Sequence, residues 1–320
     1  MSGAASQPIW LDCDPGHDDA FAIMTALHRA DLVGVSVVSG NAPVHLCERN
    51  ALATLQLAGA HDVPVHRGAD GPLVREARYA PHIHGESGLD GPELPDVTLE
   101  PRPQNAVDAI LDASQRVPDL WLVAVGPLTN VALALRHDPG LAERLAGISI
   151  MGGNWGPGNV SPVAEFNIWA DPDAAAEVFR SGANLVLAGL DLTHQFMIDD
   201  ARRGAVRALG TRLATFGADL LDFFSHAYAR TFGVPAEGPL HDPCAVLAVT
   251  DPQLFTTSRR HVEVETASEL TRGMTVVDRR AGHARAEPNV TVLETIDDEA
   301  AFDLLLGALE GTASTMEATA

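Results

Sequence analysis

Four aspartates are gathered near the start of the chain, at Asp12, Asp14, Asp18 and Asp19. They follow an apolar run, Ile9 to Leu11, which predicts a buried strand. Because like charges this close repel one another, a fold that holds them together is expected to neutralise them with a cation. A donor set of carboxylate oxygens suits a hard ion such as Ca²⁺ or Mg²⁺ better than Zn²⁺. The pattern therefore indicates a divalent metal site.

The residues between the aspartates predict how they are presented. Pro15 and Gly16 indicate a tight turn, and Asp18 and Asp19 are expected to open a helix, whose first N–H groups favour negative charge. The alternative is that the aspartates only cap this helix and end the strand. Since capping requires one aspartate and not four, we prefer the metal site. An EF-hand loop is excluded, because the spaced ligands and the closing glutamate are missing.

The amino-acid composition excludes several classes of catalytic site and of binding partner. The formal charge of −22 opposes binding to nucleic acid or to an anionic membrane. All 21 basic residues are arginines, which excludes a Walker A loop, Schiff-base chemistry and pyridoxal phosphate anchoring. The three cysteines are widely spaced and indicate neither a disulfide framework nor a zinc site. With no signal-peptide pattern and no membrane-length apolar run, we expect a cytoplasmic protein.

The hydrophobic pattern predicts an α/β fold with an open, mostly parallel, twisted sheet and flanking helices. Strand-like and helix-like segments alternate, which requires parallel pairing with right-handed crossovers. The expected strands are 9–11, 32–38, 63–66, 120–125, 148–151 and 184–190. The expected helices are 20–27, 44–57, 104–115, 127–136, 173–180, 199–209, 212–228 and 243–249.

The C-terminal part has a different pattern. Alternating residues predict a small antiparallel element built from 261–265, 274–278 and 290–294, before a closing helix that ends near residue 309. We expect a single domain over residues 8–310, with flexible tails at 1–7 and 311–320.

The periodicity lapses between residues 68 and 103, a length that favours a functional lid. Elsewhere, unusual polar and glycine residues come directly after predicted strands, where ligands bind in open parallel sheets. These residues are Asp14, Asn41, Gly126, Gly153 and Asp191.

Seven segments resemble, in order, the motifs of the nucleoside hydrolases, which cleave ribonucleosides to base and ribose with a bound Ca²⁺. They are DCDPGHDDA at 12–20, SGN at 39–41, HGESG at 84–88, VGPLTN at 125–130, MGG at 151–153, GNVSPVAEFN at 158–167 and HDPCAV at 241–246. One such motif would be weak evidence, but seven collinear motifs over residues 8–309 are specific. The resemblance is to the inosine-uridine preferring branch and implies its Rossmann-like fold.

The resemblance also implies the metal ligands. Asp14, Asp19 and Asp242 would bind Ca²⁺ together with the backbone carbonyl of Val125. Many relatives have threonine in place of Val125, but a carbonyl ligand does not depend on the side chain. Asp14 would also act as the general base toward metal-bound water, and Asp12 would support the site from behind.

The remaining roles concern the substrate, which the resemblance implies is a ribonucleoside. Hydrogen bonds to the ribose hydroxyls would come from Asp18, Asn41, Asn159, Glu165 and Asn167. His84, Met151 and Phe166 would be further substrate contacts. His241 would assist departure of the base, since an imidazole titrates near neutral pH. Base preference stays open, because 233–238 is a residue or two longer than the family pattern.

Two other functions remain possible from the residues alone. The first is a Mg²⁺-dependent phosphatase that uses the Asp-x-Asp after its first strand, although such enzymes usually place a lysine against the phosphate. The second is a non-catalytic nucleoside-binding protein, which His241 argues against. Among single residues, His84 could be solvated, and Asp171 is expected only to cap a helix. The family resemblance implies a homodimer or a homotetramer.

Overall fold

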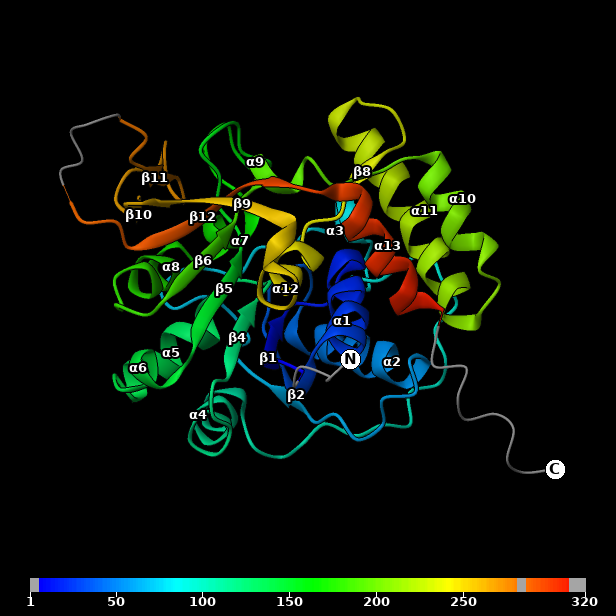
Figure 1. Ribbon diagram of the computed structural model, residues 1–320, viewed down its shortest axis with the longest axis horizontal. Helices are drawn as coiled ribbons and strands as arrows, with labels where there is room; N and C mark the ends of the chain where they lie inside the picture. Colours follow the sequence, from blue (N-terminus) through cyan, green and yellow to red (C-terminus); the bar gives the residue numbers. More distant parts are fainter. Residues whose placement is uncertain (1–5, 281–285, 311–320) are drawn as a thin grey trace.

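Eight strands form one central sheet in the computed structural model, which describes residues 6–280 and 286–310 (Figure 1). All neighbouring strands are parallel except the last pair, so the predicted fold class is confirmed. In spatial order the strands are β3 (Val65–Arg67), β2 (Asp31–Val37), β1 (Pro8–Cys13), β4 (Trp121–Ala124), β5 (Gly147–Met151), β6 (Leu185–Ala188), β12 (Val290–Ile296) and β9 (Phe255–Arg260).

Alternate side chains of the strands build a separate core on each face of the sheet. In β1, Ile9 and Leu11 join one hydrophobic cluster and Trp10 joins the other, as the two-residue period of a strand requires. The first cluster is covered by α1 (His17–Arg29), α2 (Val44–Leu57), α10 (Asp200–Ala208), α11 (Arg212–Phe232), α12 (Pro243–Thr250) and α13 (Asp298–Leu309). The second is covered by α4 (Ala106–Arg116), α5 (Thr129–His137), α6 (Leu141–Arg144) and α8 (Pro172–Phe179).

The carboxyl ends of the parallel strands meet at one edge of the sheet. The loops that follow β1, β2, β4, β5 and β6 therefore lie close together, and each carries one of the residues singled out after the predicted strands. Short helices in this region are α3 (Pro81–His84), α7 (Phe166–Ala170) and α9 (Leu190–Thr193). A two-residue ladder between β7 (Met197–Ile198) and β8 (Gly238–Pro239) joins two of the connections.

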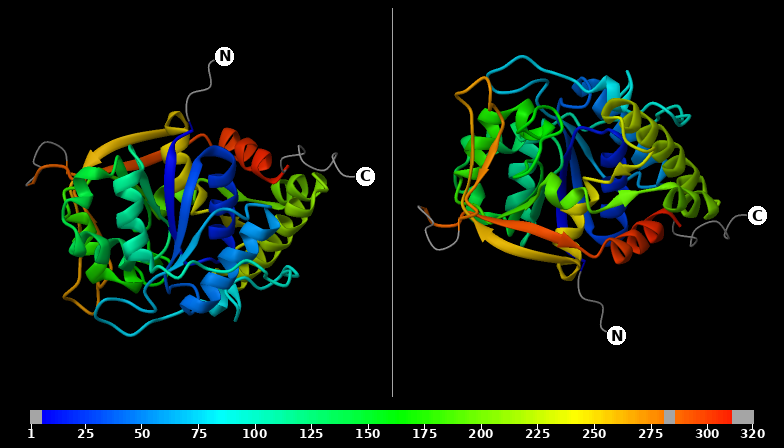
Figure 2. Two further views of the ribbon diagram at one scale, coloured as in Figure 1. Left: turned by 90° about the horizontal axis from the view of Figure 1, so that it is seen from below. Right: turned by 90° about the horizontal axis from the view of Figure 1, so that it is seen from above.

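The C-terminal strands differ in part from the prediction. Strand β10 (Val262–Val264) does pair antiparallel with β11 (Thr275–Val277). Residues 290–294, which were assigned to the same element, instead belong to β12 of the main sheet, between β6 and β9 (Figure 2). Strand β9 was missed because its sequence, FTTSRR, is an edge strand with little apolar content.

One helix boundary near the site agrees with the expectation that Asp18 and Asp19 open a helix, and another differs from the expected 212–228. Helix α1 begins at His17, so Asp18 and Asp19 lie in its first turn. Helix α11 continues to Phe232 and ends where Gly233 adopts a left-handed conformation, with φ of 68°. The segment 68–103 contains only the four-residue α3, in agreement with its lack of periodicity.

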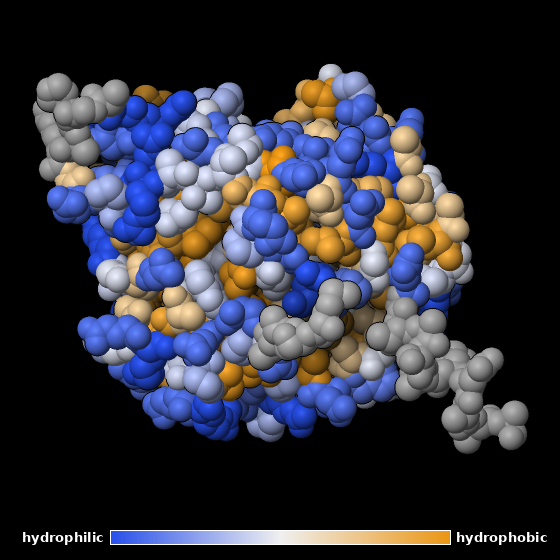
Figure 3. All heavy atoms as spheres, viewed as in Figure 1, coloured by the Kyte–Doolittle hydropathy of each residue, from blue (hydrophilic) through white to orange (hydrophobic). Residues whose placement is uncertain are grey.

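The surface and the ends of the described chain add little to the evidence for this fold class. No helix within the described residues is both long and apolar enough to cross a membrane. On the face shown in Figure 3, hydrophilic residues form most of the periphery, and patches of apolar residues lie nearer the middle. The expected tails at 1–7 and 311–320 lie outside the described residues, apart from residues 6 and 7.

Candidate active site

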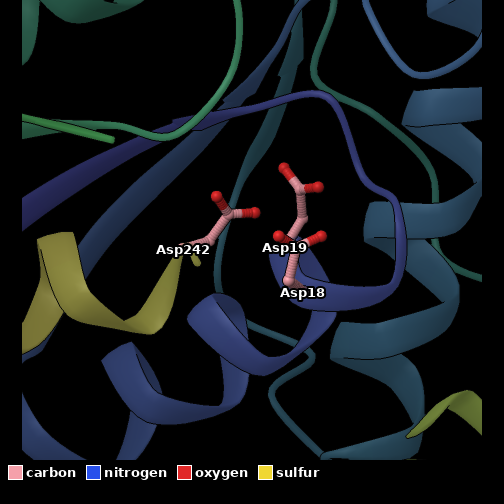
Figure 4. A group of neighbouring side chains, drawn as sticks. All are labelled: Asp18, Asp19 and Asp242. Carbon is pink, nitrogen blue, oxygen red and sulfur yellow. The ribbon is translucent and has the colours of Figure 1, made fainter. Parts of the chain in front are cut away.

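Three buried carboxyl groups converge at the carboxyl edge of the sheet. Asp18 and Asp19 come from the first turn of α1, and Asp242 comes from the start of α12 (Figure 4). One oxygen from each lies within 4.8 Å of the others. Asp242 occupies the N-cap position of α12 but makes no capping hydrogen bond, whereas Asp171 caps α8 by accepting from the Ala174 N–H. These two Asp-Pro pairs therefore differ in use, as expected.

Burial makes this cluster unfavourable when all its members are ionised. Burial and the negative charge of Asp19 raise the pKa of Asp18 to about 8. Burial, followed by the charges of neighbouring aspartates, raises the pKa of Asp14 and of Asp242 well above the ordinary range. A bound cation would remove this cost by compensating the charges directly. The donor set is composed of carboxylate oxygens, which fits a hard divalent ion.

Asp14 lies beside this cluster with one oxygen uncommitted. Its Oδ2 accepts a hydrogen bond of 2.6 Å from the Asn41 N–H, while its buried Oδ1 has no hydrogen-bond partner in the described structure. A Cβ on Gly126 would stand 2.6 Å from this Oδ1, so the glycine leaves room for it. An unpartnered buried carboxylate oxygen is costly, and either a cation or a proton would satisfy it.

The converging set and the predicted ligand set overlap without being identical. Both contain Asp19 and Asp242, but the structure brings Asp18 into the group of three and places Asp14 beside it. The fourth predicted ligand, the Val125 carbonyl, accepts a 2.8 Å hydrogen bond from Asn167 Nδ2. Asp12 is bound by Ser36 and Asn130 on the far side of the strand, which agrees with a supporting role.

A cavity of about 300 Å³ adjoins the carboxylates. Its wall includes Val125, His241 and Asp242, whereas Asp14 and Asp19 lie outside its lining. Every predicted substrate contact lines it, namely Asp18, Asn41, His84, Met151, Asn159, Glu165, Phe166 and Asn167. The sequence motifs therefore meet in one cavity, although they come from six different connections.

Glu165 is fixed by the backbone around it. It caps α7, with Oε1 accepting from Asn167 N–H at 2.8 Å and Oε2 accepting from Ile168 N–H and Gly153 N–H. Gly153 reaches this position with φ of 70°, which explains the glycine in the MGG segment. Burial raises the pKa of Glu165 to about 7.

His241 is buried and contacts the hydroxyl of Thr193. Its Nδ1 lies 2.7 Å from Thr193 Oγ1, on α9. If the hydroxyl donates to Nδ1, Nε2 carries the ring proton of the neutral imidazole. Burial lowers the pKa of His241 well below the ordinary value, so the ring is neutral near pH 7. Thr193 was not identified from the sequence, where only the neighbouring Asp191 was considered.

His84 is also buried, which removes the alternative that it is solvated. Its Nδ1 lies 3.1 Å from Nδ1 of His17 and accepts from the His17 backbone N–H at 3.3 Å. His17 in turn contacts the Asp90 carbonyl through Nε2 and stacks on Phe223 at 5.1 Å. The acidic loop therefore holds a substrate-side histidine as well as the carboxylates.

One wall of the cavity was missed by sequence reasoning. Helix α11 contributes three aromatic residues spaced four positions apart, Phe224, Tyr228 and Phe232. The ring of Tyr228 contacts both of the others. The predicted helix 212–228 included Phe224 and Tyr228 but ended before Phe232, and aromatic residues at this spacing usually mark a core face. The other additional lining residues are Arg78, Tyr79, Ala80, His82, Ile83, Val160 and Trp169. Five of these belong to the 68–103 segment.

Comparison with known proteins identifies the family. Residues 9–303 match the family described as inosine-uridine preferring nucleoside hydrolase. The pyrimidine-specific ribonucleoside hydrolase RihA of Enterobacter sp. (strain 638) is 45% identical over 302 residues, which cover 93% of this chain and 96% of that protein. RihA of Citrobacter koseri is 44% identical over 310 residues, covering 96% and 99%.

Solved structures agree with this result. The purine-preferring ribonucleoside hydrolase from Gardnerella vaginalis has a TM-score of 0.88 and 33% identity, covering 95% of this chain and 98% of that chain. The plant nucleoside hydrolase PpNRh1 has a TM-score of 0.87 and 30% identity, covering 95% and 99%. The chain belongs to the inosine-uridine preferring nucleoside hydrolase family and is a ribonucleoside N-ribohydrolase.

Proposed function

We propose that this enzyme hydrolyses pyrimidine ribonucleosides to free base and ribose in a Ca²⁺-dependent reaction. The observation that carries the proposal is the convergence of Asp18, Asp19 and Asp242 beside a cavity that also contains His241. Asp14, Asp19, Asp242 and the Val125 carbonyl are the proposed ligands, and Asp18 is close enough to share that role. When bound, the ion would compensate the buried charges and lower the pKa of a nearby water.

Asp14 is the proposed general base. Its Oδ1 is buried and uncommitted, so it can take a proton from the attacking water. Asp18, Asn41 and Asn167 are proposed to hold the 2′- and 3′-hydroxyls. Acidic groups around the ribose stabilise the positive charge that develops at C1′ as the N-glycosidic bond breaks. Attack opposite the base predicts inversion at C1′.

His241 is proposed to assist the leaving base. With Thr193 donating to Nδ1, the Nε2–H of the neutral ring is available to donate a hydrogen bond to the base, which stabilises the negative charge that develops there. The aromatic wall of α11 offers flat apolar surfaces against which a planar base can stack.

The preference for pyrimidines is supported by the relatives. The proteins that match at 44–45% identity are described as pyrimidine-specific, whereas the purine-preferring enzyme from Gardnerella vaginalis matches at 33%. Three large side chains on α11, Phe224, Tyr228 and Phe232, also line the cavity on the side proposed for the base.

A comparison of uridine, cytidine, inosine and guanosine with Ca²⁺ present tests this proposal. We expect kcat/KM for uridine and cytidine to exceed that for inosine by tenfold or more, about 1.4 kcal/mol of discrimination. Release of base is followed by chromatography, with 4-nitrophenyl phosphate as the control substrate. Equal or higher activity on purines would contradict the base preference. Phosphate release without base release would favour the phosphatase alternative.

Two expectations from the sequence accompany this proposal. A cytoplasmic location is supported by Cys13, Cys47 and Cys244, which are free and buried. A homodimer or homotetramer remains our expectation for the assembly.

A further inference from the structure

Three arginines gather beside the mouth of the nucleoside cavity. Arg75, Arg78 and Arg272 line a neighbouring cavity of about 180 Å³, whose other lining residues are Glu76, Trp169 and Ala170. Arg78 and Trp169 also line the nucleoside cavity, so the two cavities share a wall. None of the residues of α11 lines the smaller cavity. The positive cluster therefore lies on the α7 side of the site, away from the wall proposed for the base.

Two of these arginines have unused donors. Arg75 is engaged, because its Nε donates to Asp173 at 2.9 Å and its Nη2 donates to the Thr266 carbonyl at 2.9 Å. Within residues 6–280 and 286–310, neither Arg78 nor Arg272 forms an ion pair or a side-chain hydrogen bond. The Arg272 guanidinium instead stacks on Trp169, 4.4 Å from the ring centre. Stacking fixes the plane of the guanidinium and leaves its edge N–H groups free for a bidentate anion.

The three arginine side chains repel one another when no anion is bound between them. Burial, followed by the positive charges of Arg75 and Arg78, lowers the pKa of Arg272, and the negative charges of Asp173 and Glu269 oppose this shift only in part. An anion between the guanidinium groups would reverse this repulsion and form charge-assisted hydrogen bonds. The chain has a formal charge of −22, so a group of three arginines is a local positive charge on a protein whose net charge is strongly negative.

We propose that Arg78 and Arg272 form a phosphate subsite, so that the cavity binds nucleoside 5′-monophosphates. This inference rests on the proposed nucleoside site. With the 2′- and 3′-hydroxyls at the carboxylates and the base against α11, the 5′ carbon is the remaining ribose substituent, and it leaves the ring at the end opposite the base. A phosphate on that carbon would extend toward the α7 side, where Arg78 joins the two cavities.

The test is competition against cytidine hydrolysis by the Ca²⁺-loaded enzyme at low ionic strength. Initial cytosine release is measured with increasing uridine 5′-monophosphate (UMP), uridine or inorganic phosphate, which registers a competitor whether or not it is cleaved. We expect UMP to compete at least as well as uridine and far better than phosphate. Arg272→Gln should weaken UMP competition about tenfold, as expected for loss of a charge-assisted contact. The concentration of uridine needed for half-maximal competition should change much less.

Arg116→Gln is the matched control. It removes the same charge from the exposed C-terminal end of α4, and should leave UMP competition unchanged. Equal effects of the two variants would overturn the subsite, as would UMP competing more weakly than uridine. Competition by phosphate as strong as that by UMP would assign the cluster to free phosphate and also overturn the proposal. If cytidine itself is not cleaved, the underlying nucleoside site fails, which is a different result.

Discussion

Replacing Asp14 by alanine is expected to lower kcat for uridine by about a thousandfold, or about 4 kcal/mol of barrier. The reason is that Asp14 is assigned two roles, as the general base and as a metal ligand, and that its Oδ1 has no hydrogen-bond partner among residues 6–280 and 286–310. Initial rates of uracil release, with substrate saturating, measure the effect. An activity within tenfold of the wild type would show that the base assignment is wrong.

The control for this variant is Asp14→Asn, which keeps an oxygen for the Asn41 N–H but lacks the basic carboxylate. Burial raises the pKa of Asp14, so an ionised Asp14 destabilises the metal-free fold as pH rises above the ordinary aspartate range. The metal-free asparagine variant should therefore unfold at the same or a higher temperature than the wild type at pH 8. Lost activity with retained stability separates a chemical role from a structural one.

Replacing His241 by alanine is expected to lower kcat/KM for uridine by about a hundredfold or more. Its effect on 4-nitrophenyl ribofuranoside should be far smaller, because nitrophenolate departs without protonation. The ratio of the two losses is the measurement, since a general disturbance of the cavity would affect both substrates. Equal losses on the two substrates would remove the leaving-group role.

Thr193→Val provides the matched control for this histidine. The substitution preserves the shape of the threonine side chain but removes the hydroxyl that lies 2.7 Å from His241 Nδ1. If the hydroxyl selects the tautomer, the variant should show a smaller loss with the same preference between the two substrates. A loss that does not distinguish the substrates would place Thr193 in a purely structural role.

Much of the site could be predicted because its residues follow strands in sequence. Asp14, Asn41 and Glu165 occur in segments whose order matched a family pattern, and parallel strands bring such segments to one edge. The burial of the cluster and its pairing with Asp242 required the fold. Asp18 illustrates the limit, since spacing on a helix start does not tell whether its carboxylate points at the sugar or joins the cation ligands.

The missed features have physical reasons of their own. Phe224, Tyr228 and Phe232 follow a helical repeat that serves a core as well as a cavity. Strand β9 is polar because it lies at the edge of the sheet, so the alternation used for the other strands was absent. The arginine cluster contains Arg78 and Arg272, which are almost two hundred positions apart in the sequence and meet beside Trp169 only in the folded chain.

The central claim is that buried aspartates bind one divalent ion on which cleavage of the N-glycosidic bond depends. Its most direct test is a titration of chelator-stripped enzyme with CaCl₂, in which calorimetric binding and uracil release from uridine are measured on the same samples. We expect one ion per chain, with activity rising in parallel with occupancy, and neither signal in Asp242→Ala. Full activity in protein shown to be free of divalent metal would contradict the account.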